Sequence, residues 1–162
     1  MIVVEESNRN IINEAFRVLR SNVDFIKNKN TQQKVFVVTS FNPGSGKSFL
    51  SMNIAMSFAI KGKKVLVIDV DLRHGTVSAY VGSPKKGLSD YLGYEETSWN
   101  ELLITDKKYP NLHTIPVGTI PPNPTELLED KSLATLIQAL RNEYDYIFID
   151  CPPIDIVADA QI

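Results

Sequence analysis

The chain has 162 residues, of which 43% are hydrophobic and 22% charged, and its formal net charge is −2. This length fits one domain with a core of its own and leaves too little chain for two. The near-neutral charge argues against a general attraction to nucleic acid, and a single cysteine excludes an internal disulfide framework. The sequence shows neither a secretory leader nor an apolar run of roughly 20 residues, so we expect a soluble protein.

An amphipathic helix is predicted over 8–28, because apolar residues recur there at alternating spacings of four and three. The residues of this apolar stripe are Ile12, Phe16, Leu19, Val23 and Ile26. The polar residues over 29–33 predict a linker after the helix.

Two strands and a helix between them are predicted next. The apolar, β-branched run over 35–40 indicates a short buried strand, and a helical pattern follows over 47–61. Gly62 fits the C-terminal end of that helix. The nearly continuous apolar run over 65–68 then indicates a strand that is buried on both faces.

The middle of the chain predicts shorter elements. Two helical turns, over 87–92 and 98–103, precede a third strand over 112–117. The prolines within 118–125 predict an extended loop, because each proline disfavours α geometry in the residue before it.

The last predicted elements are a helix and a strand. The helix begins at Pro124 or at Asp130 and ends at Asn142, and the strand covers 146–150. Strands that alternate with helices predict an α/β fold with a mostly parallel sheet flanked by helices. In such sheets, ligands bind at the carboxyl ends of the strands.

The most informative segment is the glycine-rich turn Phe-Asn-Pro-Gly-Ser-Gly-Lys-Ser over 41–48. It lies between a predicted strand and a predicted helix. The backbone N–H groups of such a turn point at a bound phosphate, Lys47 adds a mobile positive charge, and the Ser48 hydroxyl suits Mg²⁺. The usual pattern is G-x-x-x-x-G-K-[ST], and Phe41 stands where its first glycine is expected. The segment therefore predicts a nucleotide-binding site, and the departure at Phe41 narrows the kinds of nucleotide-binding protein that fit.

Carboxylates follow two of the other predicted strands. Asp69 and Asp71 come after the second strand, and Asp150 ends the last one. Each of them has an ordinary explanation as a loop or capping residue. Beside a phosphate-binding turn, however, one carboxylate can hold Mg²⁺ directly or through water, and another can orient or deprotonate the attacking group. We therefore favour a functional role for all three.

With these elements in place, the chain resembles the bacterial protein-tyrosine kinases (BY-kinases) of capsule and exopolysaccharide export. The resemblance covers nearly the whole chain and rests on five motifs in the family's order. They are Glu14-x-x-Arg17-x-x-Arg20, Ser40-x-x-Pro43-x-x-Gly46-Lys47-Ser48, the apolar strand over 65–68 with Asp69-x-Asp71-x-Arg73, Pro121-Pro122-Asn123-Pro124-x-Glu126-Leu127-Leu128, and the strand over 146–149 ending in Asp150.

The resemblance implies a P-loop NTPase-like fold, ATP and ADP as nucleotides, and Mg²⁺. Its implied catalytic residues are Lys47, Asp69 and Asp71, with Lys47 on the β- and γ-phosphates and Asp69 as the acceptor of the tyrosine hydroxyl proton. Its implied metal-binding residues are Ser48, Asp71 and Asp150. Its implied cofactor-binding residues are Pro43, Gly44, Ser45, Gly46, Lys47, Ser48 and Phe49.

The resemblance also implies an assembly. Glu14, Arg17 and Arg20 would join copies of the chain into a ring, although an intrahelical pair between Glu14 and Arg17 explains those two residues equally well. The implied partners are a membrane adaptor, in the same chain or a separate one, and a cognate tyrosine phosphatase, with no nucleic acid. The implied location is cytoplasmic, at the inner face of the membrane.

Two alternatives remain open. A partitioning-type ATPase with a deviant nucleotide loop shares this fold, but its K-G-G-x-x-K-[ST] pattern has a lysine where Asn42 stands here. A nucleotide-binding regulatory module without catalysis is the other alternative, and it has no need for the Asp69 and Asp71 pair.

The expected domain organisation is a single domain over 1–162, with the helix and linker over 1–33 and the nucleotide-binding core over 34–162. The family's kinase domain usually continues further and ends in a tyrosine-rich tail. We therefore expect a C-terminally truncated chain.

Overall fold

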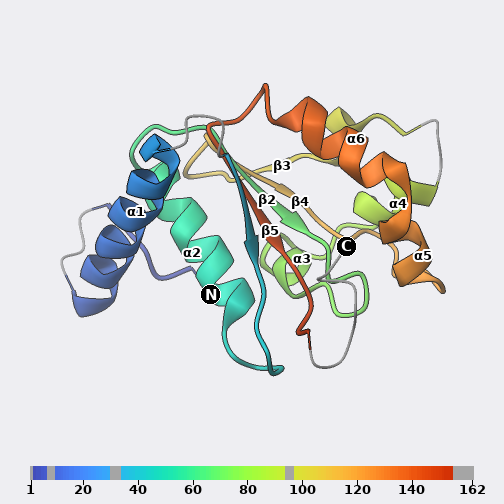
Figure 1. Ribbon diagram of the computed structural model, residues 1–162, viewed down its shortest axis with the longest axis horizontal. Coiled ribbons are helices and arrows are strands. Elements are labelled where there is room, and N and C mark those ends of the chain that lie inside the picture. The colour runs from blue at the N-terminus through green and yellow to red at the C-terminus, as the bar shows by residue number, and fades with distance from the viewer. Residues whose placement is uncertain (1, 7–9, 30–33, 94–96, 155–162) are drawn as a thin grey trace.

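The structure is a computed structural model that describes residues 2–6, 10–29, 34–93 and 97–154. A central sheet lies between two groups of helices, with α1 and α2 on one side and α4, α5 and α6 on the other (Figure 1). The predicted linker lies mostly outside the described residues, as do the start of the first predicted helix and the last eight residues.

The described part of the chain forms one five-stranded sheet with the order β1-β5-β2-β4-β3. The first four strands in this order are parallel, and β3 is antiparallel to β4. The predicted fold, a mostly parallel sheet flanked by helices, is therefore confirmed. The strands are β1 (Val35–Val38), β2 (Val65–Asp69), β3 (Ile104–Thr105), β4 (Leu112–Ile115) and β5 (Tyr146–Asp150).

The helices agree with the predicted ones in place more than in length. The two elements that the sequence did not predict are α3 and β3. The helices are α1 (Ile11–Lys29), α2 (Lys47–Ala59), α3 (Thr76–Tyr80), α4 (Leu88–Gly93), α5 (Pro124–Glu129) and α6 (Lys131–Leu140), and a 3-10 turn, η1, covers Trp99–Leu102.

The predicted helix between Pro124 and Asn142 is two helices, because the backbone at Asp130 is extended. The Asp130 side chain accepts a hydrogen bond from the Ser132 N–H at 2.7 Å and so caps α6. Both predicted starting points are therefore real helix starts.

The two central strands contribute to two separate cores. Val65 and Val67 of β2 face α1 and α2, whereas Leu66 and Ile68 face α4, α5 and α6. β5 alternates in the same way, and every residue of both strands is buried. Since the two strands are parallel and in register, Asp69 and Asp150 lie side by side where they end. The sheet thus brings distant carboxylates to one place.

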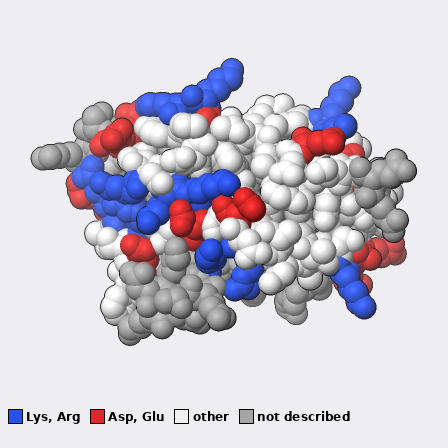
Figure 2. Space-filling model, turned by 90° about the horizontal axis from the view of Figure 1, so that it is seen from above, with Lys and Arg blue, Asp and Glu red and all other residues white. Residues whose placement is uncertain are grey.

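No helix among the described residues is both long and apolar enough to cross a membrane. On the face shown in Figure 2, Lys and Arg side chains lie next to Asp and Glu side chains, in keeping with the small net charge of −2.

Candidate active site

The turn between β1 and α2 has the geometry of an anion-binding site. Gly44 and Gly46 have φ angles of 73° and 84°, in the left-handed region that glycine adopts without a steric cost. α2 begins at Lys47, directly after Gly46, which has no side chain to cap the first N–H groups of the helix. These N–H groups and the positive end of the helix dipole are therefore available to a phosphate.

Lys47, Ser48, Asp71 and Asp150 meet at the start of α2. The Lys47 Nζ atom lies 3.4 Å from Asp71 Oδ2 and 3.8 Å from Asp150 Oδ2. Ser48 donates its hydroxyl hydrogen to Asp150 Oδ2 over 2.6 Å. One cation therefore sits between two carboxylates from two different strand ends.

Asp150 is fully buried, and it accepts a second hydrogen bond from the Ser51 hydroxyl over 2.8 Å. Burial raises the pKa of Asp150, while the hydrogen bond from Ser48 and the charge of Lys47 act in the opposite direction. Ser51 was not predicted. Its spacing from Ser48, three residues along the same helix, is the signal that places both hydroxyls on one face.

Asp69 is also fully buried, but one of its oxygens is bonded to α3 and the other to the Asp71 backbone. Its Oδ2 accepts hydrogen bonds from the Ser78 N–H and the Ser78 hydroxyl, both over 2.8 Å, and its Oδ1 accepts one from the Asp71 N–H over 3.2 Å. Burial raises the pKa of Asp69 to about 6, and the bonds from Ser78 oppose that rise.

A hollow of about 420 Å³ opens above the loop, and we call it the phosphate pocket. All seven predicted cofactor-binding residues line it, together with Asp71, whereas the fully buried Asp69 and Asp150 are not among its lining residues. The lining residues that sequence reasoning missed are His74, Thr76, Tyr80 and Pro153.

His74 connects the pocket wall to Asp71. Its Nδ1 lies 3.1 Å from Asp71 Oδ1, and its backbone N–H donates to the same oxygen over 3.2 Å. On the other side of the same turn, Arg73 donates to the Thr125 hydroxyl over 3.0 Å. The turn after β2 is therefore tied to the start of α5, which directly follows the proline-rich segment.

The predicted interface residues lie on α1, outside the phosphate pocket. Glu14 and Arg17 form an ion pair within the helix. Arg20 donates to the Ser57 carbonyl oxygen, near the end of α2, over 2.9 Å. Burial lowers the pKa of Arg20.

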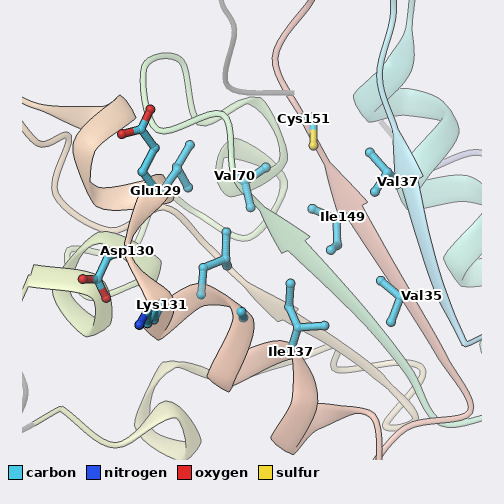
Figure 3. A pocket seen from close by; sticks show the side chains of 12 residues that line it. Val35, Val37, Val70, Glu129, Asp130, Lys131, Ile137, Ile149 and Cys151 are labelled. Carbon is cyan, nitrogen blue, oxygen red and sulfur yellow. The ribbon is translucent and has the colours of Figure 1, made fainter. Parts of the chain in front are cut away.

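A second hollow, of about 470 Å³, lies between β1 and α6, on the face of the sheet that α4, α5 and α6 cover (Figure 3). Val35, Val37, Ile149 and Ile137 give it apolar walls, and Glu129, Asp130 and Lys131 lie along one side. None of the predicted site residues lines it.

The model of the family described as AAA domain matches residues 33–160. CapB of Staphylococcus aureus is 38% identical over 99% of this chain, which covers 70% of CapB. Tyrosine-protein kinase CpsD of Streptococcus pneumoniae is 41% identical over 92% of this chain, which covers 64% of CpsD.

Among solved structures, the kinase domain of Escherichia coli tyrosine kinase ETK matches 96% of this chain with a TM-score of 0.83 and 31% identity, and 65% of that domain is covered. The architecture is that of a P-loop NTPase-like domain, a class that binds nucleotides. The chain belongs to the AAA domain family and to the bacterial tyrosine-protein kinases. The resemblance drawn from the five motifs is confirmed, and the chain spans about two thirds of the length of these relatives.

Proposed function

We propose that this chain is the nucleotide-binding part of an ATP-dependent protein-tyrosine kinase that regulates capsule or exopolysaccharide production. The observation that carries the proposal is the meeting of Lys47, Ser48, Asp71 and Asp150 at an uncapped helix N-terminus. This set combines a phosphate cradle, a mobile cation and metal-seeking oxygens. The names of CpsD and ETK support tyrosine as the acceptor.

The residues present fit Mg·ATP. Mg²⁺ usually takes one or two carboxylates and completes its shell with phosphates and waters. The Ser48 hydroxyl with Asp71 and Asp150 supplies such a set, and the described residues hold no group of three or more acidic, His or Cys side chains that would bind a metal alone. When bound, Mg²⁺ neutralises phosphate charge.

In this reaction, the tyrosine oxygen bonds to the γ-phosphorus while the bond from that phosphorus to the ADP oxygen breaks. Loop N–H groups and Lys47 hold the phosphates in line and neutralise their charge, which is most of what a loose phosphoryl transition state requires. The tyrosine proton passes to a carboxylate, for which Asp69 is the sequence-based candidate.

Asp69 and Asp71 differ in what they contact. Asp71 lines the phosphate pocket, whereas Asp69 is fully buried, does not line it, and is bonded to Ser78 and to the Asp71 backbone. The role of Asp69 as proton acceptor stays a prediction. Asp69→Asn and Asp71→Asn each keep the shape of the side chain and remove its charge. A comparison of peptide phosphorylation by the two variants therefore tests the two carboxylates separately.

The test mixes the purified protein with Mg·ATP and a tyrosine-containing acceptor peptide, and phosphotyrosine is detected by immunoblot. Wild type and the exposed control Lys63→Met are expected to phosphorylate the peptide, and Lys47→Met is not. ATP hydrolysis without phosphotyrosine would instead indicate the partitioning-type ATPase. Nucleotide binding without either activity would indicate a regulatory module.

Assembly and location form a second part of the proposal. We propose that the protein lies in the cytoplasm beside a membrane adaptor and a phosphatase. We propose that the ring contact uses the outer face of α1, where the ion-paired Glu14 and Arg17 are partly exposed. Light scattering of Arg17→Ala against wild type tests the ring. An unchanged mass would contradict this contact.

A further inference from the structure

Ser78 lies in α3, with only 6% of its surface exposed, and no motif in the sequence points to it. Its hydroxyl makes two hydrogen bonds of 2.8 Å. It donates to Asp69 Oδ2, and it accepts the N–H of Val117, just beyond β4. The Ser78 backbone N–H donates to the same oxygen of Asp69.

This arrangement requires a group that both donates and accepts at one point. A hydroxyl does so, whereas a methyl group does neither. An alanine at this position leaves the Val117 N–H without its acceptor and removes one of the three donors to the Asp69 carboxylate. Buried groups that lose a partner in this way keep their full desolvation cost.

The hydrogen bonds continue from Asp69 to the phosphate pocket. Asp69 Oδ1 accepts the Asp71 N–H, and the Asp71 side chain lies against Lys47 and on the pocket wall. An unbroken chain of bonds thus runs from Val117 through Ser78 and Asp69 to Asp71.

We infer that Ser78 is a positioning residue, which fixes the Asp69 carboxylate and through it the turn that presents Asp71 to bound nucleotide. The inference rests on the proposed kinase function for its effect on rate. Its effect on the position of Asp71 is independent of that function. The β2–β4 pairing in the described sheet ends at Ile68 and Ile115. Just beyond that point, the Ser78 hydroxyl links Asp69, at the end of β2, to Val117, which follows β4.

A buried serine of a different kind provides the control. The Ser57 hydroxyl is 1% exposed and donates to the Ile54 carbonyl oxygen within its own helix. It contacts no carboxylate in the described part of the chain. Ser57→Ala therefore reports the cost of losing a buried hydroxyl without any change at Asp69.

The experiment compares Ser78→Ala, Ser78→Thr and Ser57→Ala in peptide phosphorylation at saturating Mg·ATP. Loss of positioning is expected to lower kcat about 10-fold to 100-fold in Ser78→Ala, with KM for ATP within about two-fold, because small misplacements act on the transition state. Ser78→Thr keeps the hydroxyl and is expected to restore kcat. Ser57→Ala is expected to match wild type.

A wild-type kcat in folded Ser78→Ala would overturn the inference, and so would an equal loss in Ser57→Ala. If Ser78→Ala does not fold, Ser78→Cys takes its place, since it has nearly the same shape and only a weak donor. Crystal structures of the variant and the wild type with Mg·ADP provide a readout that needs no kinase activity. The Asp71 side chain is expected to shift in the variant, and an unmoved Asp71 contradicts the inference. Wild type without phosphotyrosine contradicts the kinase proposal instead.

Discussion

Asp69 and Asp150 are paired in register at the ends of β2 and β5, yet their carboxylates accept hydrogen bonds from different helices. Asp150 is held by Ser48 and Ser51 of α2, the helix that follows the phosphate loop, and Asp69 is held by Ser78 of α3. Two neighbouring strand ends thus have separate supports. One support comes from the helix that follows the phosphate loop, and the other comes from the short helix that follows the turn with Asp71.

Nucleotide and metal are expected to stabilise the folded chain together. A ligand that binds only the folded state at 100 times its Kd adds about 2.7 kcal/mol to the free energy of unfolding. Mg·ADP should therefore raise the Tm of wild type in a thermal shift assay, and EDTA should remove part of the rise. Ser48→Ala should lose the part that depends on magnesium. A wild-type Tm that EDTA does not change, or an EDTA-sensitive rise in Ser48→Ala as large as that of wild type, would contradict a metal role for Ser48.

Arg20 and Arg17 are expected to affect stability differently. Arg20 donates to a carbonyl near the end of α2, and a hydrogen bond from a charged group contributes about 1.5–3 kcal/mol. Arg17 pairs with Glu14 at the surface, where such pairs contribute about 0.2–0.5 kcal/mol. Urea denaturation followed by circular dichroism should therefore show the larger loss for Arg20→Ala. Equal losses would refute the α2 contact.

The close approach of two backbones at Gly87 predicts a strong substitution effect. A Cβ atom at this position would lie 2.2 Å from the Gly118 nitrogen and 2.3 Å from the Pro116 oxygen. Gly87→Ala is therefore expected to cost more than about 2 kcal/mol of unfolding free energy, because backbone has to move.

Gly93 is the matched control for Gly87. A Cβ atom there meets nothing within 4 Å, and its φ is not in the left-handed region. Gly93→Ala is expected to be neutral or stabilising by up to about 1 kcal/mol. A small loss in Gly87→Ala, comparable with that of Gly93→Ala, would show that the two backbones do not meet.

His113 is expected to make stability depend on pH. Its ring bonds to the Tyr144 hydroxyl, and burial, with a smaller effect from Lys64, lowers the pKa of His113. The unfolded chain then binds a proton more readily than the folded one. This contribution to stability is complete above about pH 6.5, the unfolded pKa, and is lost as the pH falls through the folded pKa.

The test of His113 is urea denaturation of wild type and His113→Gln between pH 5 and pH 8. The difference in unfolding free energy between them should shrink as the pH falls. The raised pKa values of Asp69 and Asp150 act in the opposite direction in both proteins and cancel in that difference. If the difference in unfolding free energy does not vary with pH, His113 does not contribute to the pH dependence of stability.

The parallel strands and the phosphate loop were predictable because their signals are local. β2 and β5 are short apolar runs that end in a carboxylate, and the loop ends in Gly46, Lys47 and Ser48. Since parallel strands end at one edge of a sheet, the closeness of Asp71 and Asp150 to the loop followed from those signals.

The missed features depend on contacts that are distant in sequence. α3 has five residues, of which Thr76 and Val77 are β-branched, and it packs through the bonds of Ser78 to Asp69 and Val117. β3 has two residues and pairs with β4 at the edge of the described sheet. No periodic pattern marks elements this short, so Ser78 had no signal in the sequence.

The two elements that flank the phosphate loop differ in how deeply they are buried. α2, at one end, is buried along nearly its whole length from Ser51 onwards, whereas β1, at the other end, is an edge strand of the described sheet, with Val37 57% exposed. Local opening begins where few buried contacts resist it. Of the two elements that flank the loop, α2 is therefore the more rigid and β1 the less rigid. We therefore expect local opening of the loop to begin on the β1 side, while α2 keeps Lys47 and Ser48 in place.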